Sequence, residues 1–154
     1  NLHPSEMEKR TEILKHFLGA TGKQLLIEQP FRCDYGYNIR VGENFYANMG
    51  CTILDEALVT FGDNVLLAPN VSIYTAGHAV NVAQRIVGWE YAYPVTVGHN
   101  VWIGGNVVIL PGVSIGDNSI IGGGSVVTKD IPANVIAVGN PCKVIRELTE
   151  DELK

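Results

Sequence analysis

The sequence has little of what marks several large classes of protein. Its 154 residues include only three cysteines, with no metal-ligand spacing between them, which argues against a disulfide-rich scaffold or a cysteine zinc site. Eleven basic residues face 16 acidic ones, and this net charge of −5 disfavours nucleic-acid binding and attachment to a membrane surface. The longest apolar stretch, residues 101–115, is broken by glycine, asparagine and proline, so no membrane span is expected.

The sequence also lacks a secretory signal pattern, a Walker loop and a G-x-S-x-G nucleophile motif. The first absence predicts a cytoplasmic protein, and the other two give no support to phosphate-loop or serine-nucleophile chemistry. Hydrophobic residues make up 46% of the chain and charged residues 18%, a balance typical of one ordered domain with a real core.

Glycine is in excess, with 17 residues, and its spacing follows a repeat. Six β-branched residues follow one another at intervals of six: Val97, Ile103, Ile109, Ile115, Ile121 and Val127. A period of six fits neither an α-helix nor a simple strand, and it is typical of a hexapeptide β-helix. In that fold each hexad forms a short strand and a turn, three hexads close one triangular coil, and the aliphatic residues stack inside.

The same pattern appears earlier in the chain. Residues 41–44 and 61–64 match the Gly-Asp-Asn turn at 116–118, with two extra residues between Ile53 and Phe61. The predicted fold is therefore all-β, a parallel β-helix of hexapeptide repeats over residues 21–148.

Two further segments flank this repeat body. We expect an amphipathic helix at 4–18 within an N-terminal segment 1–20, with Ser5 and Glu8 as a capping box. Residues 149–154 are expected to form a short C-terminal helix or tail.

One segment, residues 76–94, abandons the repeat and is predicted to be an extruded loop that carries function. It begins near His78, and because imidazole titrates near neutrality, His78 is a candidate general base; a structural loop histidine is the alternative. His3, His16 and His99 are expected to be solvated. With no partner at ligand spacing, no metal site is predicted.

The remaining reactive residues give weaker signals. Arg32 could lower the pKa of Cys33, but no histidine lies near it in the sequence, so the cysteines are poor nucleophile candidates. Lys129, Lys143 and Arg146 form a small basic group late in an acidic chain. They could meet the phosphates of a coenzyme or be ordinary surface charge.

Several motifs together resemble the maltose/galactoside O-acetyltransferase family of hexapeptide-repeat acyltransferases. The matching segments lie at 45–48, 75–78, 100–104, 111–118, 124–132 and 139–146. The resemblance implies a left-handed β-helix, a homotrimer with active sites between neighbouring subunits, acetyl-CoA as donor and a sugar hydroxyl as acceptor. It implies no metal. Family members carry a further segment before the helix, with an acidic acceptor-site residue, that this sequence does not show.

The resemblance also implies roles for single residues. His78 matches the general base, Glu90 a position beside it that could orient the ring, and Asn48 an acceptor contact in the active site. Asp34 and Glu56 match acceptor-side polar positions, with solvated surface carboxylates as the alternative. Gly105 matches an oxyanion donor, and the other positions that match the coenzyme groove are Trp102, Gly123, Thr128, Lys129, Lys143 and Arg146. Lysine at 143, where many relatives have arginine, would make no bidentate phosphate contact.

Three other functions are consistent with the same repeat. A xenobiotic acetyltransferase would use the same scaffold and a loop histidine on antibiotic hydroxyls, although its loop is typically longer. A carbonic-anhydrase-like β-helix would need three converging histidines, and only His78 and His99 lie in suitable places. A non-catalytic assembly or binding module would show no activity that depends on His78.

Overall fold

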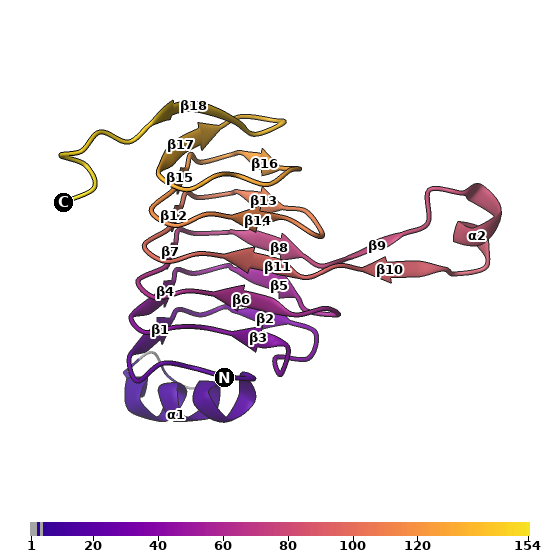
Figure 1. Ribbon diagram of the computed structural model, residues 1–154. Coiled ribbons are helices and arrows are strands. Elements are labelled where there is room, and N and C mark those ends of the chain that lie inside the picture. The colour runs from indigo at the N-terminus through magenta and orange to yellow at the C-terminus, as the bar shows by residue number, and fades with distance from the viewer. Residues whose placement is uncertain (1–2, 4) are drawn as a thin grey trace.

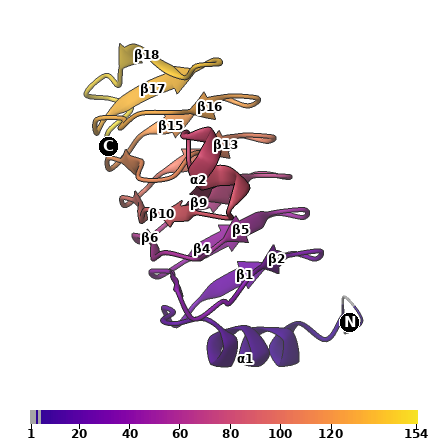
Figure 2. The same cartoon turned by 90° about the vertical axis from the view of Figure 1, so that its right-hand side faces the viewer.

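The computed structural model describes residue 3 and residues 5–154. Their body is a parallel β-solenoid whose three sheets form the three sides of a prism (Figures 1 and 2). Sheet 1 consists of β1 (Leu25–Ile27), β4 (Phe45–Ala47), β7 (Leu66–Leu67), β12 (Trp102–Ile103), β15 (Ile120–Ile121), β17 (Val135–Val138) and β18 (Lys143–Glu147). Sheet 2 consists of β2 (Arg32–Cys33), β5 (Thr52–Leu54), β8 (Ser72–Tyr74), β13 (Val108–Ile109) and β16 (Val126–Val127). Sheet 3 consists of β3 (Ile39–Arg40), β6 (Val59–Phe61), β11 (Val95–Val97) and β14 (Ser114–Ile115).

The chain visits sheets 1, 2 and 3 in turn and then starts the next coil. We call the turn from sheet 1 to sheet 2 the first corner, that from sheet 2 to sheet 3 the second corner, and that from sheet 3 back to sheet 1 the third corner. This order confirms the predicted parallel β-helix, and it decides which residues share an edge of the prism.

The strand register reproduces the hexad arithmetic. Trp102 pairs with Ile120, so one uninterrupted coil takes 120 − 102 = 18 residues, or three hexads. Tyr46 pairs with Leu66, 20 residues on, because the earlier coil holds the two extra residues. Leu66 pairs with Trp102, 36 residues on, so 36 − 18 = 18 residues leave the coil between them.

Those residues form an arm that projects from the second corner (Figures 1 and 2). The arm consists of β9 (Ala76–His78), the short helix α2 (Val82–Ile86) and β10 (Glu90–Ala92), with β9 and β10 paired antiparallel. Asn81 caps α2 by accepting a hydrogen bond from Gln84 N–H. The predicted extruded loop is therefore an ordered hairpin with a helical tip.

The six-residue β-branched series lies inside the prism, and each of its members is at most 2% exposed. Burial of such a side chain contributes roughly 1.5–3 kcal/mol, so the stack supplies much of the drive for folding. Near the C-terminal end, Ser119 and Ser125 replace aliphatic residues and are fully buried. Ser119 Oγ donates to Pro132 O at 2.8 Å and Ser125 Oγ accepts from Gly139 N–H at 2.9 Å, so their burial leaves no unpaired hydroxyl.

Asparagines build the third corner as a ladder. Their backbones have positive φ, between 55° and 62°, and each side-chain amide donates to the next asparagine along the prism; the members are Asn44, Asn64, Asn100, Asn118 and Asn134. Asparagine suits both tasks, because it tolerates the left-handed region and its amide has both a donor and an acceptor.

Replacement of Asn118 is expected to separate these two contributions. Asn118→Gly removes the amide but keeps the backbone freedom that a φ of 59° requires. Asn118→Ala removes the amide and adds left-handed strain of about 1–2 kcal/mol. Urea unfolding at one protein concentration should rank stability as wild type, then glycine, then alanine; alanine at or above glycine would contradict the assignment.

The two ends of the prism are closed differently. Helix α1 (Met7–Phe17) lies under the first coil, where its buried Arg10 donates to Ile27 O at 2.7 Å (Figure 1). The predicted capping box is wrong: the helix begins at Met7, and Glu6 is its N-cap without a side-chain cap. The expected start at Pro4 lies outside the described residues. At the other end β18 turns back antiparallel on β17, and residues 149–154 form turns with no helix.

Candidate active site

The hairpin pairing of the arm brings His78 and Glu90 together. These two residues are direct partners in the β9–β10 register, and His78 Nδ1 lies 3.5 Å from Glu90 Oε1. Both side chains are about 60% exposed (62% and 61%), so a substrate could reach the imidazole. A carboxylate at Nδ1 favours a proton on that nitrogen and leaves Nε2 to accept one. The geometry is that of an oriented general base.

Carboxylates gather on the second corner, in the two coils below the base of the arm. Asp34 follows β2 and Glu56 follows β5, and Glu56 Oε2 lies 3.3 Å from the hydroxyl of Thr75, at the root of the arm. Partial burial, a hydrogen bond with Glu56 and the charges of Glu56 and Asp55 raise the pKa of Asp34. The structure therefore places the two predicted acceptor carboxyls in contact, on the corner that carries His78.

A third carboxylate, Asp55, was not singled out from the sequence. It is fully buried and accepts backbone hydrogen bonds from Asp34, Tyr35 and Gly36 at 3.1, 2.9 and 2.8 Å. Asp55 thus holds the turn that presents Asp34. Its inward place, two residues after Ile53 in the alternating pattern, was the available signal.

The second corner also carries two of the predicted coenzyme residues. Thr128 and Lys129 follow β16 above the arm, and both are exposed. They therefore lie away from Gly105 and Gly123, the glycines with which the sequence grouped them.

Those glycines lie on the first corner, where they form a furrow with little side-chain cover. Gly105 follows β12 and Gly123 occupies the equivalent place in the next coil, after β15. A Cβ on Gly123 would meet no described atom closer than Gly105 O at 3.2 Å, and one on Gly105 none closer than Pro69 O at 3.3 Å. Both φ angles lie outside the glycine-only region. The backbone of this chain therefore does not by itself require glycine here, whereas close approach by a ligand would.

The furrow also offers a free backbone donor. Gly104 N–H donates to Ile121 O and Asn106 N–H donates to Pro69 O, whereas Gly105 N–H donates to no other residue in the described chain. A backbone N–H without an internal acceptor is what an oxyanion donor requires.

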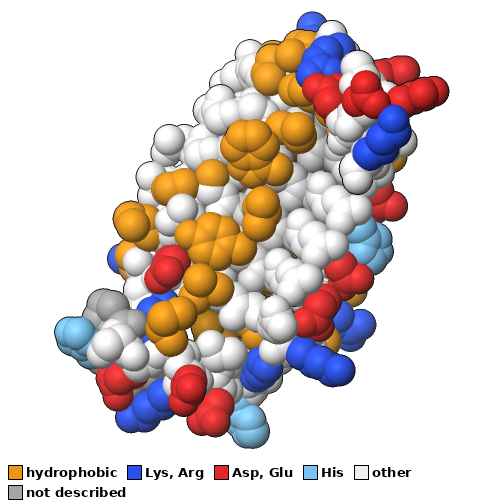
Figure 3. Space-filling view, turned by 90° about the vertical axis from the view of Figure 1, so that its left-hand side faces the viewer, with side chains coloured by type: hydrophobic (Ala, Val, Ile, Leu, Met, Phe, Trp, Pro, Cys, Tyr) orange, Lys and Arg blue, Asp and Glu red, His pale blue; other side chains and the backbone are white. Residues whose placement is uncertain are grey.

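Asn48 and Trp102 lie beside this furrow. Asn48 follows β4 at the first corner, and its Oδ1 accepts from Met49 N–H at 2.8 Å, which orients the amide. Trp102 projects from sheet 1 and is 51% exposed, between Leu66 and Ile120 in the register. Figure 3 shows that side of the molecule, where hydrophobic side chains form a band across its surface.

The basic residues near the C-terminus continue this surface. Lys143 begins β18 next to the first corner, and Arg146 lies opposite Ile136 on the same strand. Glu152 grips the Arg146 guanidinium with two contacts of 2.7 Å and also accepts from Thr149 N–H at 2.8 Å. Arg146 is therefore held in place, with its end face already paired.

This ion pair makes a testable pH dependence. Hydrogen bonds from Arg146 and Thr149 lower the pKa of Glu152 from its usual 4.5 to about 2. A depressed carboxyl pKa means that the paired tail is favoured above about pH 4.5 and loses that support as the pH falls towards 2. Carboxyl NMR titration should find Glu152 near 2, and near its usual value in Arg146→Gln; equal pKa values in both proteins would refute the pairing.

The other reactive groups are not arranged for chemistry. Burial, with the charges of Asp55 and Asp34, raises the pKa of Cys33 to about 11, so the suggestion that Arg32 lowers it is wrong. Burial also raises the pKa of Cys51 and Cys142. Within residue 3 and residues 5–154, no three His, Cys, Asp or Glu side chains are grouped to hold a metal ion. His99 lies on the third corner, where its Nδ1 accepts from Asp63 N–H at 2.9 Å.

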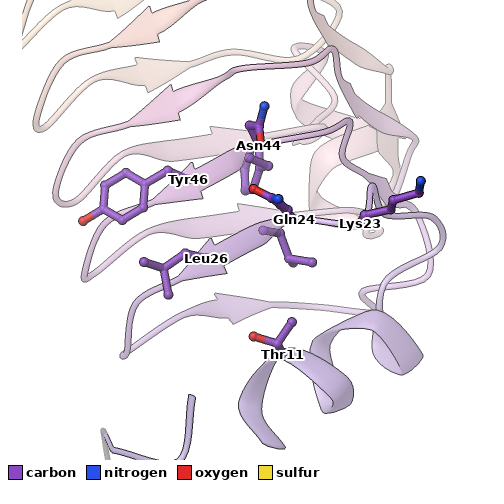
Figure 4. Close-up of a pocket in the computed structure, with 8 residues that line it drawn as sticks. Thr11, Lys23, Gln24, Leu26, Asn44 and Tyr46 are labelled. Atoms are coloured by element: carbon purple, nitrogen blue, oxygen red, sulfur yellow. The ribbon is translucent and has the colours of Figure 1, made fainter. Parts of the chain in front are cut away.

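A pocket between α1 and the first coils of sheet 1 contains none of the predicted site residues (Figure 4). It is lined by Thr11, Lys23, Gln24, Leu25, Leu26, Asn44, Phe45 and Tyr46. In the described part of the chain, no helix is long and apolar enough to cross a membrane.

The predicted site residues thus fall into two groups on different edges of the prism. The second corner holds His78, Glu90, Asp34, Glu56, Thr128 and Lys129. The first corner and the adjoining sheet 1 hold Asn48, Trp102, Gly105, Gly123, Lys143 and Arg146. Sheet 2 separates the groups, so one chain does not bring the general base to the furrow.

Comparison with known proteins agrees with the repeat and the fold. Residues 94–129 match the family model described as bacterial transferase hexapeptide (six repeats). The chain is 54% identical to galactoside O-acetyltransferase of Escherichia coli over 148 residues, 96% of this chain and 73% of that protein. It is 57% identical to a putative acetyltransferase of Saccharomyces cerevisiae over 151 residues, 98% of this chain and 77% of that protein.

Two solved structures superpose on nearly the whole chain. A galactoside acetyltransferase in complex with coenzyme A has a TM-score of 0.96 at 52% identity, covering 99% of this chain and 76% of that one. A maltose O-acetyltransferase from Clostridium difficile 630 also has a TM-score of 0.96, at 58% identity, covering 97% of this chain and 80% of that one. The repeat, the solenoid and these relatives lead to one conclusion: the chain belongs to the maltose/galactoside O-acetyltransferase family of hexapeptide-repeat acyltransferases.

Proposed function

We propose that this protein transfers an acetyl group from acetyl-CoA to a sugar hydroxyl, with His78 as general base. The observation that carries the proposal is the His78–Glu90 pair across the arm hairpin, which leaves Nε2 of an exposed imidazole to take a proton. Relatives named galactoside and maltose O-acetyltransferase, one of them solved with coenzyme A, support the donor and the acceptor class.

The transfer needs no covalent enzyme intermediate. Nε2 of His78 takes the proton of the acceptor hydroxyl while its oxygen attacks the thioester carbonyl. The oxyanion of the tetrahedral intermediate would accept a hydrogen bond from Gly105 N–H. Its collapse breaks the carbon–sulfur bond, and the imidazolium returns the proton to the thiolate, which yields the acetyl ester and free coenzyme A. Glu90 stabilises the imidazolium throughout.

The separation of the two residue groups supports a site made by two copies of the chain. A neighbour that lays its first corner against the second corner of this chain would bring His78 to Gly105 and Trp102. The exposed hydrophobic band on sheet 1, which includes Leu66 at 46% and Trp102 at 51% exposed, is consistent with such burial. We propose the homotrimer of the family as this assembly.

In that arrangement each substrate is held by both copies. Acetyl-CoA would lie along the furrow of Gly105 and Gly123 beside Trp102, with Lys143 and Arg146 near its phosphates and Thr128 and Lys129 supplied from the facing corner. The acceptor would meet Asp34 and Glu56 on the corner of His78 and Asn48 on the other corner. Carboxylates accept hydrogen bonds from sugar hydroxyls, which suits this class of acceptor.

The experiment that tests the function is release of free thiol from acetyl-CoA with glucose, maltose, a galactoside or chloramphenicol as acceptor. Acetylation of a sugar at the highest kcat/KM supports the proposal, and the best sugar defines the acceptor. Faster acetylation of chloramphenicol would replace it with a xenobiotic acetyltransferase. Absence of turnover with every acceptor, together with no binding of coenzyme A, would leave an assembly module.

A further inference from the structure

The arm carries an aromatic contact that the proposed chemistry does not use. Its hairpin has few ties to the prism, and most of its residues beyond His78 are exposed, including Val80 at 90%. An isolated two-stranded hairpin is only marginally stable in water. A general base on such an element needs something to fix its direction.

Two tyrosines on β10 and just after it link the arm to the body. Tyr93 packs beside the turn of the next coil, since a Cβ on Gly112 would lie 3.4 Å from Tyr93 Cβ, and Tyr93 N–H donates to Thr75 O at 2.8 Å. The rings of Tyr93 and Tyr91 contact each other, with centroids 5.2 Å apart and planes tilted by 34°. This spacing is typical of a favourable aromatic pair.

Tyr91 then covers the residue that precedes the general base. Tyr91 and Gly77 are direct partners in the hairpin register, next to the His78–Glu90 pair. A Cβ on Gly77 would lie 2.5 Å from Tyr91 Oη and 2.6 Å from Cζ, so the ring lies across the bare glycine backbone. An aromatic ring that covers a cross-strand glycine is a known way to stiffen a hairpin.

We propose that Tyr91 and Tyr93 form a brace that sets the direction of the arm and so positions His78. This inference rests on the proposed function, because it assigns a positioning role only if His78 is the general base. The contacts run without a gap from the Gly112 turn through Tyr93 and Tyr91 to Gly77. Successive strand residues alternate between faces, so the rings lie on the face opposite His78 and Glu90 and leave the imidazole open.

The test is a set of four kinetic variants, assayed as assembled protein with acetyl-CoA and the best acceptor. Tyr91→Ala should lower kcat about 10- to 10²-fold, the scale of a misplaced catalytic group, while KM for acetyl-CoA stays within about twofold. Tyr91→Phe keeps the ring and should retain the wild-type kcat. In the His78→Ala background, Tyr91→Ala should cause no further loss, because the group it positions is gone.

These outcomes separate failure of the brace from failure of the proposed function. Wild-type activity in His78→Ala would overturn the general-base assignment itself. With His78→Ala impaired, a wild-type kcat in Tyr91→Ala would overturn the brace, and so would losses that multiply in the double variant. Amide hydrogen exchange gives a readout without activity: Tyr91→Ala should speed exchange over residues 76–92 but not over 95–121, and unchanged exchange in the arm would refute the inference.

Discussion

Replacing His78 with alanine is expected to lower kcat by about 10²- to 10⁴-fold, the share of rate that a positioned general base supplies. KM for acetyl-CoA should change little, since the donor groove lies on a different corner of the prism from the arm. The loss should be seen in the thiol-release assay with the best acceptor. It should also be accompanied by a normal melting temperature, because the His78 side chain is 62% exposed and makes no core contact.

His99→Ala is the matched control for this loss. His99 is similarly exposed, at 55%, and lies near a carboxylate, with Nδ1 3.5 Å from Asp63 Oδ2, but it stands on the third corner. Its loss should slightly weaken the turn whose N–H it accepts and should leave kcat unchanged. Equal kcat values for the two alanine variants would remove His78 from the mechanism.

Filling the furrow on the first corner is the second change with a large expected effect. Gly123→Trp should abolish saturation by acetyl-CoA and lower kcat/KM by about 10²-fold or more, because the indole would occupy the space a ligand needs. The fold should survive, since Gly123 is exposed and its φ lies outside the glycine-only region. Coenzyme A binding by calorimetry and thermal melting report the two effects separately.

Thr96→Trp controls for the added bulk. Thr96 lies on β11 of sheet 3 and is exposed, with its side chain away from both residue groups. The indole there should leave coenzyme affinity as in wild type. If Gly123→Trp bound coenzyme A as tightly as Thr96→Trp, the furrow would not be the donor site.

The body of the fold could be predicted from local pattern. Hexad spacing from Val97 to Val127 determines strand, turn and inward face together, because a parallel coil repeats one local geometry and pairs each residue with its equivalent in the next coil. The ladder at the third corner follows from the Gly-x-Asn turns for the same reason. Where the repeat ends, local rules were less reliable: Ser5 and Glu8 have capping-box spacing, yet α1 begins at Met7.

The candidate site could be predicted residue by residue but not as an arrangement. Spacing in the sequence does not show on which edge of a prism a turn falls, so Thr128 and Gly123 seemed to belong together although two different corners carry them. The His78–Glu90 contact depends on hairpin register, which hexad periodicity does not specify inside an inserted arm. Burial explains Cys33 better than its neighbour Arg32 does, and burial depends on tertiary packing.

The central claim is that one active site takes its general base from one subunit and its donor furrow from the next. Co-expression of His78→Ala with Gly123→Trp chains tests it most directly, because each variant is impaired alone and supplies what the other lacks. In a closed ring with random mixing, about a quarter of the interfaces should pair an intact His78 with an intact furrow. The account predicts thiol release at about a quarter of the wild-type rate; a mixture no more active than its two parents would contradict it.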